Sequence, residues 1–266
     1  MTAFSGRTAI LGTQHGKEAV IAPLLESALG LHVEVLRDFD TDRFGTFTGE
    51  IARLRNAKDT VRAKALAALV EAPHGAFGVA SEGSFGPHPD VPFVSCGLEL
   101  VMLTTHDGVV EVIGTDLTLE TNFAGVDVRS LDDVAAFAQR ATFPSHALVV
   151  KACATHTSSG VAITKGIREW SVLESAVMAL LARDGIATLE TDMRAHLNPT
   201  RMQSIARATA SLVRAASSLC PRCDAPGFVV TGVERGLPCE ACGRPTQRPL
   251  AELLVCGKCA HRESRV

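Results

Sequence analysis

The sequence lacks any apolar run that approaches the roughly 20 residues needed to span a bilayer. It also lacks a charged and then apolar signal segment at residues 1–16. Neither charge is in strong excess, because the net charge is −3 and the pI is near 6.3. A membrane anchor and a global basic surface are therefore not expected, and a nucleic-acid partner would need a local basic patch. We expect a soluble cytoplasmic protein.

Two common ligand-binding motifs are also missing. The loop at residues 12–18 does not have the GxxxxGK[ST] spacing of a Walker loop. The acidic loop at residues 38–50, which ends at Glu50, has neither the ligand spacing nor the length of an EF-hand. This second loop is either a divalent-cation loop of another kind or a solvated surface turn.

The chain of 266 residues is long enough for one large domain and a small appendage. Apolar periodicity and turn residues predict an α/β domain over residues 1–217, with a mixed sheet flanked by helices. The CxxC pairs that follow predict a zinc ribbon over residues 218–266. The expected strands are residues 7–11, 31–36, 76–80, 98–105, 109–117 and 147–151. The expected helices are residues 18–29, 56–72, 130–141, 167–183 and 199–217.

The stretch VASEGSFGPHP at residues 79–89 is the first candidate site. An apolar run ending at Ala80 predicts a buried strand that stops at an acid, two glycines and a proline. Ligands gather beyond the carboxyl ends of strands in open α/β sheets, which would place Glu82 there. Ser81, Ser84 and His88 would lie nearby. Glu99, near the start of a later strand, could face the same cleft. The alternative is an ordinary strand-ending turn.

The loop between the first strand and the first helix is a candidate anion site. It contains two glycines and leads into a helix N-terminus, where unpaired N–H groups and the helix dipole favour negative charge. Lys17 would add a full charge, and His15 is a weaker candidate beside it. The alternative is a turn with a solvated lysine. Lys64 adjoins the apolar stripe of a later helix, where it either snorkels to solvent or reaches into the site.

A second anion clamp is predicted immediately before the last helix. Asp192, Arg194, His196 and Arg201 are crowded near a helix start, and arginine matches phosphate bidentately. A structural ion pair between Asp192 and one of the two arginines is the alternative. His146 stands at the entrance of a strand, where it is either a structural histidine or a ligand contact.

The C-terminal tail contains three CxxC pairs. Two such pairs close one tetrahedral zinc site, and a segment of this size needs the metal to fold. Six thiols exceed the four that one site needs, so the choice of pairs stays open, as does a second, incomplete site that includes His261. A purely structural ribbon is favoured over one that binds nucleic acid or protein, because the basic residues are scattered. The candidate zinc ligands are Cys220, Cys223, Cys239, Cys242, Cys256 and Cys259.

The whole chain resembles an uncharacterised bacterial family that is known as a domain of unknown function. That resemblance brings no established activity with it. It rests on the motifs HGKE (residues 15–18), DTDRFGTFTGE (40–50), ASEGSFGPHP (80–89), FPSH (143–146), TDMRAHLNPTRM (191–202) and the CPRC, GLPCEAC and CGKC knuckles.

A more distant resemblance is to the inosine triphosphate pyrophosphatase superfamily of nucleotide hydrolases. It rests on a T-x-x-x-K loop at residues 13–17, an acid, a helix that runs from Asn56-Ala57 to Lys64-Ala65, and a strand followed by an acid and glycines. The resemblance implies the fold of that superfamily. It also implies that Lys17 binds phosphate, that Glu50 and Glu82 hold Mg²⁺, that Lys64 neutralises charge, and that His196 and Arg201 contact the nucleotide.

The sequence departs from this pattern where the superfamily has paired acids, because Glu82 stands alone. The general base is therefore unassigned, with Glu99 and Asp192 as candidates. The leading expectation is a hydrolase of a nucleotide or another phosphorylated small molecule that depends on Mg²⁺ or Mn²⁺. The alternative is a non-catalytic protein that binds such a ligand and whose zinc ribbon contacts nucleic acid or a protein partner. A homo-oligomer is left open.

Overall fold

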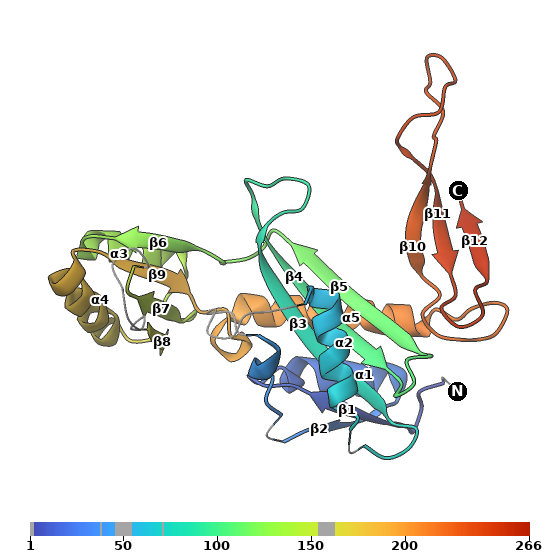
Figure 1. Cartoon of the computed structure of the whole chain (residues 1–266), viewed down its shortest axis with the longest axis horizontal. Coiled ribbons are helices and arrows are strands. Elements are labelled where there is room, and N and C mark those ends of the chain that lie inside the picture. Colours follow the sequence, from blue (N-terminus) through green and yellow to red (C-terminus); the bar gives the residue numbers. More distant parts are fainter. Residues whose placement is uncertain (1–2, 38, 46–54, 71, 154–162) are drawn as a thin grey trace.

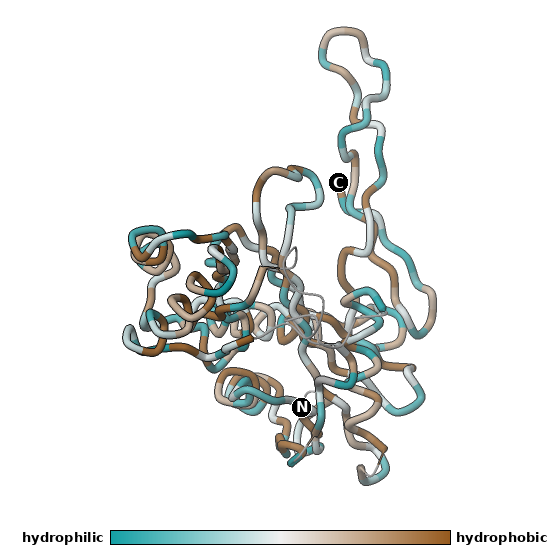
Figure 2. The backbone as a smooth tube through the Cα atoms, turned by 60° about the vertical axis from the view of Figure 1, so that its left-hand side comes forward, coloured by the Kyte–Doolittle hydropathy of each residue, from teal (hydrophilic) through white to brown (hydrophobic). Residues whose placement is uncertain are grey.

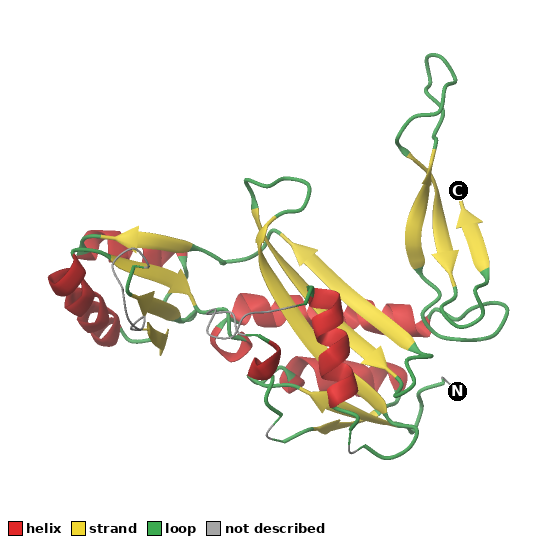
Figure 3. Cartoon of the chain, viewed as in Figure 1, coloured by secondary structure: helices red, strands yellow, loops and turns green. Residues whose placement is uncertain are grey.

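The computed structural model describes residues 3–37, 39–45, 55–70, 72–153 and 163–266. Within these ranges the chain forms three sheets, and the five-stranded sheet lies between a four-stranded sheet and a three-stranded ribbon (Figure 1 and Figure 3). No helix in the described ranges is long and apolar enough to cross a membrane.

The central sheet is mixed, as the sequence predicts. Its strand order is β2-β1-β3-β4-β5, with β1 parallel to both β2 and β3, and with antiparallel pairing from β3 through β5. The hairpin predicted at residues 106–108 joins β4 to β5. The strands are β1 (Thr8–Gly12), β2 (His32–Val35), β3 (Phe77–Pro87), β4 (Ser95–Thr104) and β5 (Glu111–Thr118).

Helices cover both faces of this sheet. The helices α1 (Glu18–Leu29) and α5 (Pro199–Ser217) pack on one face and share the largest apolar core with β1, β3 and β4. The helix α2 (Ala57–Ala67) packs on the opposite face. Glycines let the helices approach closely, because a side-chain carbon at Gly78 would collide with the backbone of α2, and one at Gly114 with the backbone of α5.

The strand β3 runs through the stretch where the sequence predicts a strand end. It pairs with β4 from Gly78, opposite Thr104, to Pro87, opposite Ser95. Glu82 therefore lies inside a strand, and the expectation of a strand that stops after Ala80 is wrong. The polar residues after Ala80 remain in the sheet because side chains from distant elements satisfy them, as described below.

A second sheet is inserted between β5 and α5, where the sequence predicts a single sheet for the whole domain. Its order is β6-β9-β7-β8, all neighbours are antiparallel, and it has an apolar core of its own. Only the strand at residues 147–151 and the two helices were expected here. The elements are β6 (Gly125–Val128), α3 (Leu131–Arg140), β7 (Leu148–Lys151), β8 (Ile163–Ile167), α4 (Trp170–Asp184) and β9 (Ala187–Thr191).

The ribbon leaves the end of α5 and consists of β10 (Val230–Arg235), β11 (Pro249–Val255) and β12 (Arg262–Arg265), paired antiparallel. The hairpin beyond β10 and β11 stands clear of the rest of the chain in both views (Figure 1 and Figure 2). Every residue of β10 is exposed. The small apolar core of the ribbon gathers instead around two cysteines, Cys220 and Cys256.

Candidate functional site

The loop between β1 and α1 turns back sharply before the helix begins. His15 and Gly16 both have left-handed backbone angles, with φ of 68° and 72°. Lys17 follows at the N-cap of α1 and makes no side-chain capping hydrogen bond. The N–H groups of Ala19 and Val20 in the first turn donate to the carbonyls of Gly16 and Lys17, at 3.2 and 3.1 Å. The positive end of the helix dipole, with no side-chain cap on it, still favours an anion here.

Lys17 is buried at this helix end. Its Nζ donates a hydrogen bond to Ser81 Oγ of β3 at 3.2 Å. Burial lowers the pKa of Lys17 to about 7, and the nearby cation of Arg201 adds to the effect. A lysine with such a pKa can gain or lose its proton near neutrality, which marks a candidate functional group.

Arg201 and Glu99 form a second buried pair on the same face of the sheet. The Arg201 Nε lies 2.6 Å from Glu99 Oε1, with side chains 1% and 0% exposed. Arg201 also donates to the carbonyl of Met193. Gly83 makes room for the pair, since a Cβ there would lie 2.5 Å from Glu99 Oε1. The other carboxylate oxygen of Glu99 is buried and accepts no hydrogen bond within the described part of the chain.

Glu82 forms its ion pair on the opposite face. Its Oε2 lies 2.6 Å from Lys64 Nζ, and both side chains are buried. Side chains alternate along a strand, so Glu82 faces α2 with Ala80 while Ser81 and Gly83 face α1 and α5. Glu99 pairs with Gly83 in the register and shares that second face. The expectation that Glu99 faces the same cleft as Glu82 is therefore wrong.

The loop before α5 brings three of the predicted residues to the Lys17 face. Asp192 is paired with Arg194 at 2.6 Å, which is the structural ion pair that was considered as an alternative. Burial opposes ionisation of Asp192, but the Arg194 guanidinium and backbone N–H outweigh it and hold the pKa of that carboxyl below its usual range. His196 stacks on His15 with ring centroids 4.9 Å apart.

Both histidines are neutral near physiological pH. Burial, followed by repulsion from His196 and Lys17, lowers the pKa of His15 to about 4. Partial burial and the Arg194 cation lower the pKa of His196. We refer below to the cation cluster, which is defined as the cations Lys17, Arg194 and Arg201 together with the two neutral histidines beside them, His15 and His196.

The helix α5 presents Arg201 through a local cap. The Asn198 side chain accepts a hydrogen bond from the Arg201 N–H at 3.0 Å, and Pro199 follows it at the helix start, as the sequence predicts. His146 contacts the same helix end, with Nε2 2.9 Å from Thr200 Oγ1. Its other ring nitrogen lies 3.0 Å from Ser145 Oγ, so both ring nitrogens have structural partners.

Three other predicted residues are not placed in the cation cluster. Ser84 lies farther along β3, and His88 lies past the end of that strand, where its Nδ1 accepts a hydrogen bond from the Asp90 N–H. Glu50 lies outside the described residues. The sequence interpretation grouped Ser81 with Glu82 and gave Gly83 a role in a turn, because it took this stretch to be a strand end. Because successive side chains of a strand point to opposite faces of the sheet, a strand here would have placed Ser81 and Gly83 on the face away from Glu82.

Among the described residues, no group of three carboxylates or histidines lies close enough together to bind Mg²⁺ or Mn²⁺. In the described ranges, only one group brings at least three His, Cys, Asp or Glu ligand atoms together, and it consists of cysteines. Glu82, Glu99 and Asp192 are each engaged by a cation.

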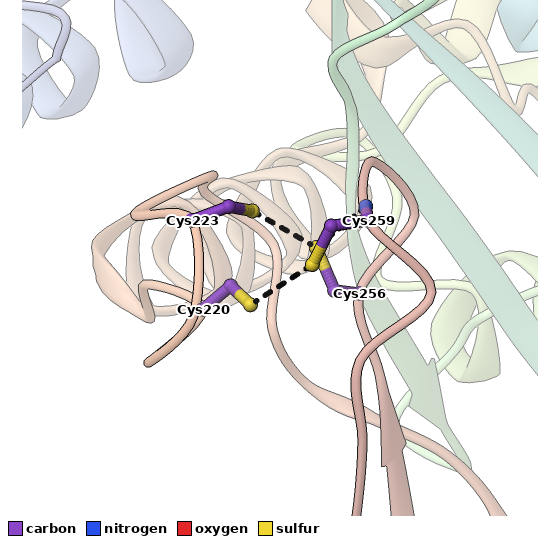
Figure 4. Close-up of side chains that lie close together, drawn as sticks. All are labelled: Cys220, Cys223, Cys256 and Cys259. Atoms are coloured by element: carbon purple, nitrogen blue, oxygen red, sulfur yellow. Dashed lines mark hydrogen bonds between the residues drawn. The ribbon is translucent and has the colours of Figure 1, made fainter.

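That group is the cysteine quartet, defined as Cys220, Cys223, Cys256 and Cys259, from the first and third CxxC knuckles (Figure 4). Its sulfur atoms lie within 4.8 Å of one another. The separations of 3.7 Å (Cys220 to Cys259) and 3.6 Å (Cys223 to Cys256) approach the roughly 3.8 Å expected between thiolates on tetrahedral zinc. The quartet could therefore hold a metal such as zinc.

The electrostatics of the quartet favour thiolate at one position in particular. Burial opposes ionisation of Cys256, but the backbone N–H groups of Cys259 and Lys258 outweigh it and lower the pKa of that thiol to about 6. Cys239 and Cys242 are not in the quartet, so the choice of pairs that the sequence left open falls on the first and third knuckles. His261 instead contacts Glu263 at 3.1 Å and stacks on Phe228.

The comparisons with known proteins identify a family and no activity. No curated protein and no solved structure gives a significant match. The matches do not include the inosine triphosphate pyrophosphatase superfamily. The profile of one family, described as "Domain of unknown function (DUF6671)", matches residues 65–266, which begin just after Lys64 and extend through the ribbon. Since this match covers most of the sequence, the chain belongs to the family of unknown function DUF6671.

Proposed function

We propose that the cation cluster binds the phosphate groups of a nucleotide or another phosphorylated small molecule. The observation that carries the proposal is Lys17, a buried lysine at a helix N-terminus whose hydrogen bond goes to a hydroxyl. Buried charges are normally paired, since an uncompensated one costs several kcal/mol. A bound phosphate would supply the missing counter-charge.

The charges around Lys17 support an anionic ligand. Glu99 neutralises Arg201, and Asp192 neutralises Arg194. Among the described residues of this face, Lys17 is therefore the surplus cation. The α1 N-terminus adds partial positive charge on the same side. Arg194, with 30% of its side chain exposed, and the exposed His196 connect the cluster to solvent.

Metal-dependent hydrolysis of the same ligand, with an inosine triphosphate pyrophosphatase-like fold, is the second candidate. The buried Glu99 oxygen that lacks a hydrogen bond favours it, because an open carboxylate oxygen beside a phosphate site is a ligand that Mg²⁺ accepts. When bound, Mg²⁺ or Mn²⁺ would neutralise phosphate charge and lower the pKa of a bound water. The chain itself would hold the phosphates through Lys17 and Arg201 and orient them against β3. Glu99 and Asp192 remain the candidates for the general base.

The binding proposal is tested by calorimetry with inorganic phosphate, nucleoside monophosphates and nucleoside triphosphates. Lys17→Met keeps an unbranched side chain of nearly the same length and removes its charge. A lost hydrogen bond to a charged group costs about 1.5–3 kcal/mol, so we expect affinity to fall roughly 10- to 100-fold. Lys58→Met, at an exposed position of α2, is the matched control and should bind like the native protein. Equal affinities for the two variants would refute the proposal.

Turnover is tested separately with a panel of canonical and deaminated nucleoside triphosphates in Mg²⁺ or Mn²⁺. Release of phosphate or pyrophosphate that is lost in Glu99→Gln, while Glu82→Gln retains it, would favour hydrolysis on the Lys17 face. Loss in Glu82→Gln alone would assign the chemistry to the opposite face. Phosphate binding without turnover would favour the non-catalytic alternative, in which the ribbon contacts nucleic acid or a protein partner.

A further inference from the structure

The middle CxxC knuckle lies apart from the cysteine quartet. Cys239 and Cys242 are in the hairpin that links β10 to β11, the part of the ribbon that projects farthest from the body (Figure 1 and Figure 2). Cys242 is exposed, and Cys239 is partly so. Within the described ranges, no His, Asp, Glu or further Cys joins them as a third metal ligand.

This knuckle has the same backbone fold as the two knuckles that form the quartet. In each, the N–H of the first cysteine donates to a carbonyl five residues later, and the N–H after the second cysteine donates back to the first. The first bonds are Cys220 to Ala225, Cys239 to Arg244 and Cys256 to His261, each 2.8 Å. The return bonds are Asp224 to Cys220 (2.9 Å), Gly243 to Cys239 (2.8 Å) and Ala260 to Cys256 (3.0 Å).

Two further features match. The residue after each second cysteine has a left-handed backbone, with φ of 54° at Asp224, 71° at Gly243 and 56° at Ala260. The N–H groups of Ala241 and Cys242 also contact the Cys239 sulfur, as those of Lys258 and Cys259 contact Cys256. In the quartet this fold directs the two thiols of each knuckle toward those of the other. The middle knuckle therefore presents two thiols in the same way, but no second CxxC pair faces it within the described residues.

We propose that Cys239 and Cys242 form half of a tetrahedral zinc site, which the same knuckle of a second copy of this chain completes. Two thiols from each copy give the four that structural zinc prefers, and a two-fold axis through the ion relates them. The projecting hairpin lets two tips meet while the bodies stay apart. The tip also carries acidic Glu240 and basic Arg244, so it is mixed in charge rather than self-repelling.

The bridging step involves no redox change. Four thiols lose protons to solvent as four zinc–sulfur bonds form, so assembly weakens as pH falls. Among the described residues of the tip, Leu237 is the one large apolar side chain that is exposed, at 39%, so the ion supplies most of the affinity between the copies. Association should therefore depend on the metal. This inference does not depend on the proposed phosphate site.

The test measures mass by light scattering and zinc content on the full chain, loaded with zinc and kept in a phosphine reductant. We expect a dimer with one ion in each quartet and one shared ion, three ions per dimer. Cys239→Ser/Cys242→Ser should be a monomer that retains the quartet ion, and that retained ion shows that the ribbon is folded. Ala241→Ser, at an exposed position of the same knuckle, is the matched control and should dimerise.

Three results would overturn the proposal. The first is a native monomer with one ion per chain. The second is a native monomer with two ions per chain, in which case the middle knuckle is completed by other ligands. The third is a dimer that persists in the double serine variant, since its interface would lie elsewhere.

Discussion

Replacing Gly83 with alanine should destabilise the protein, because the added methyl group has no room beside a buried ion pair. An ideal Cβ at this position lies 2.5 Å from Glu99 Oε1 and 2.6 Å from Arg201 Nη2, where contacts under 3.0 Å are essentially never seen. The pair cannot swing into solvent, since its side chains are 1% and 0% exposed. Arg201 is also held by the carbonyl of Met193.

The magnitude depends on whether the pair shifts or separates. Overpacking a core costs about 1–3 kcal/mol, and breaking a buried pair costs roughly 3–5 kcal/mol. We therefore expect Gly83→Ala to lower the free energy of unfolding by about 2–4 kcal/mol. The measurement is urea unfolding of the zinc-loaded protein, followed by circular dichroism.

Gly86→Ala is the control in the same strand. Nothing lies within 4 Å of a Cβ added at Gly86, so its free energy of unfolding should stay within about 0.5 kcal/mol of the native value. Both substitutions change backbone entropy and strand propensity in the same direction, so these effects largely cancel between them. Equal unfolding midpoints for the two variants would refute the packing of β3 against the Glu99–Arg201 pair.

Three further predictions follow from the buried charges and the ribbon. Stability should rise with pH between about 7 and 10.5, because unfolded Lys17 holds a proton that the folded form has released. The slope is at most about 1.4 kcal/mol per pH unit, and Lys17→Met should remove it in urea titrations of the zinc-loaded protein; an unchanged slope would place its origin elsewhere. Lys64→Met should cost about 3–5 kcal/mol by leaving Glu82 buried without its main counter-charge. The double variant Lys64→Met/Glu82→Gln should cost less than that, and a cost equal to the sum of the single variants would contradict the pairing. Zinc removal by a chelator should unfold residues 219–266 first, because the ribbon core is small; limited proteolysis should then cut the ribbon before the central sheet, and the reverse order would contradict a metal-dependent ribbon.

Local signals predicted the helices that frame the site. The helix α1 spans Glu18–Leu29, as expected, and ends at Gly30 in the left-handed conformation that a glycine cap favours. The helix α5 begins at Pro199 after the Asn198 cap, as expected. Both signals reside within a few residues of the helix end, so they can be detected without knowledge of the fold.

The course of β3 could not be predicted in the same way. The polar residues of its second half are typical of a turn. They are compatible with a buried strand only because Lys17, Lys64 and the Glu99–Arg201 pair contact them. Those partners come from α1, α2, β4 and α5, far away in the sequence. The strands of the second sheet were missed for another reason, since β6, β8 and β9 are each only four or five residues long.

The cysteines show the same division between local and long-range information. CxxC spacing predicted three knuckles, and all three have the expected local fold. Which two knuckles come together depends on the pairing of β10, β11 and β12. That pairing brings the first and third knuckles together and places the second at the hairpin tip. Spacing alone contains no information on that pairing.

The alternation of β3 and β4 also changes where chemistry is to be sought. A metal site on Glu82 would require a second carboxylate on the α2 face. The resemblance assigns that role to Glu50, which lies outside the described residues. The other two candidates, Glu99 and Asp192, lie with the cation cluster on the other side of the sheet. On that side Lys17 remains as a buried cation next to a hydroxyl and an uncapped helix end. An anion satisfies all three features at once, whereas a cation alone would add to the repulsion that already lowers the pKa of Lys17. A divalent ion would therefore enter this face together with its phosphate ligand, so phosphate binding is the step to measure before turnover.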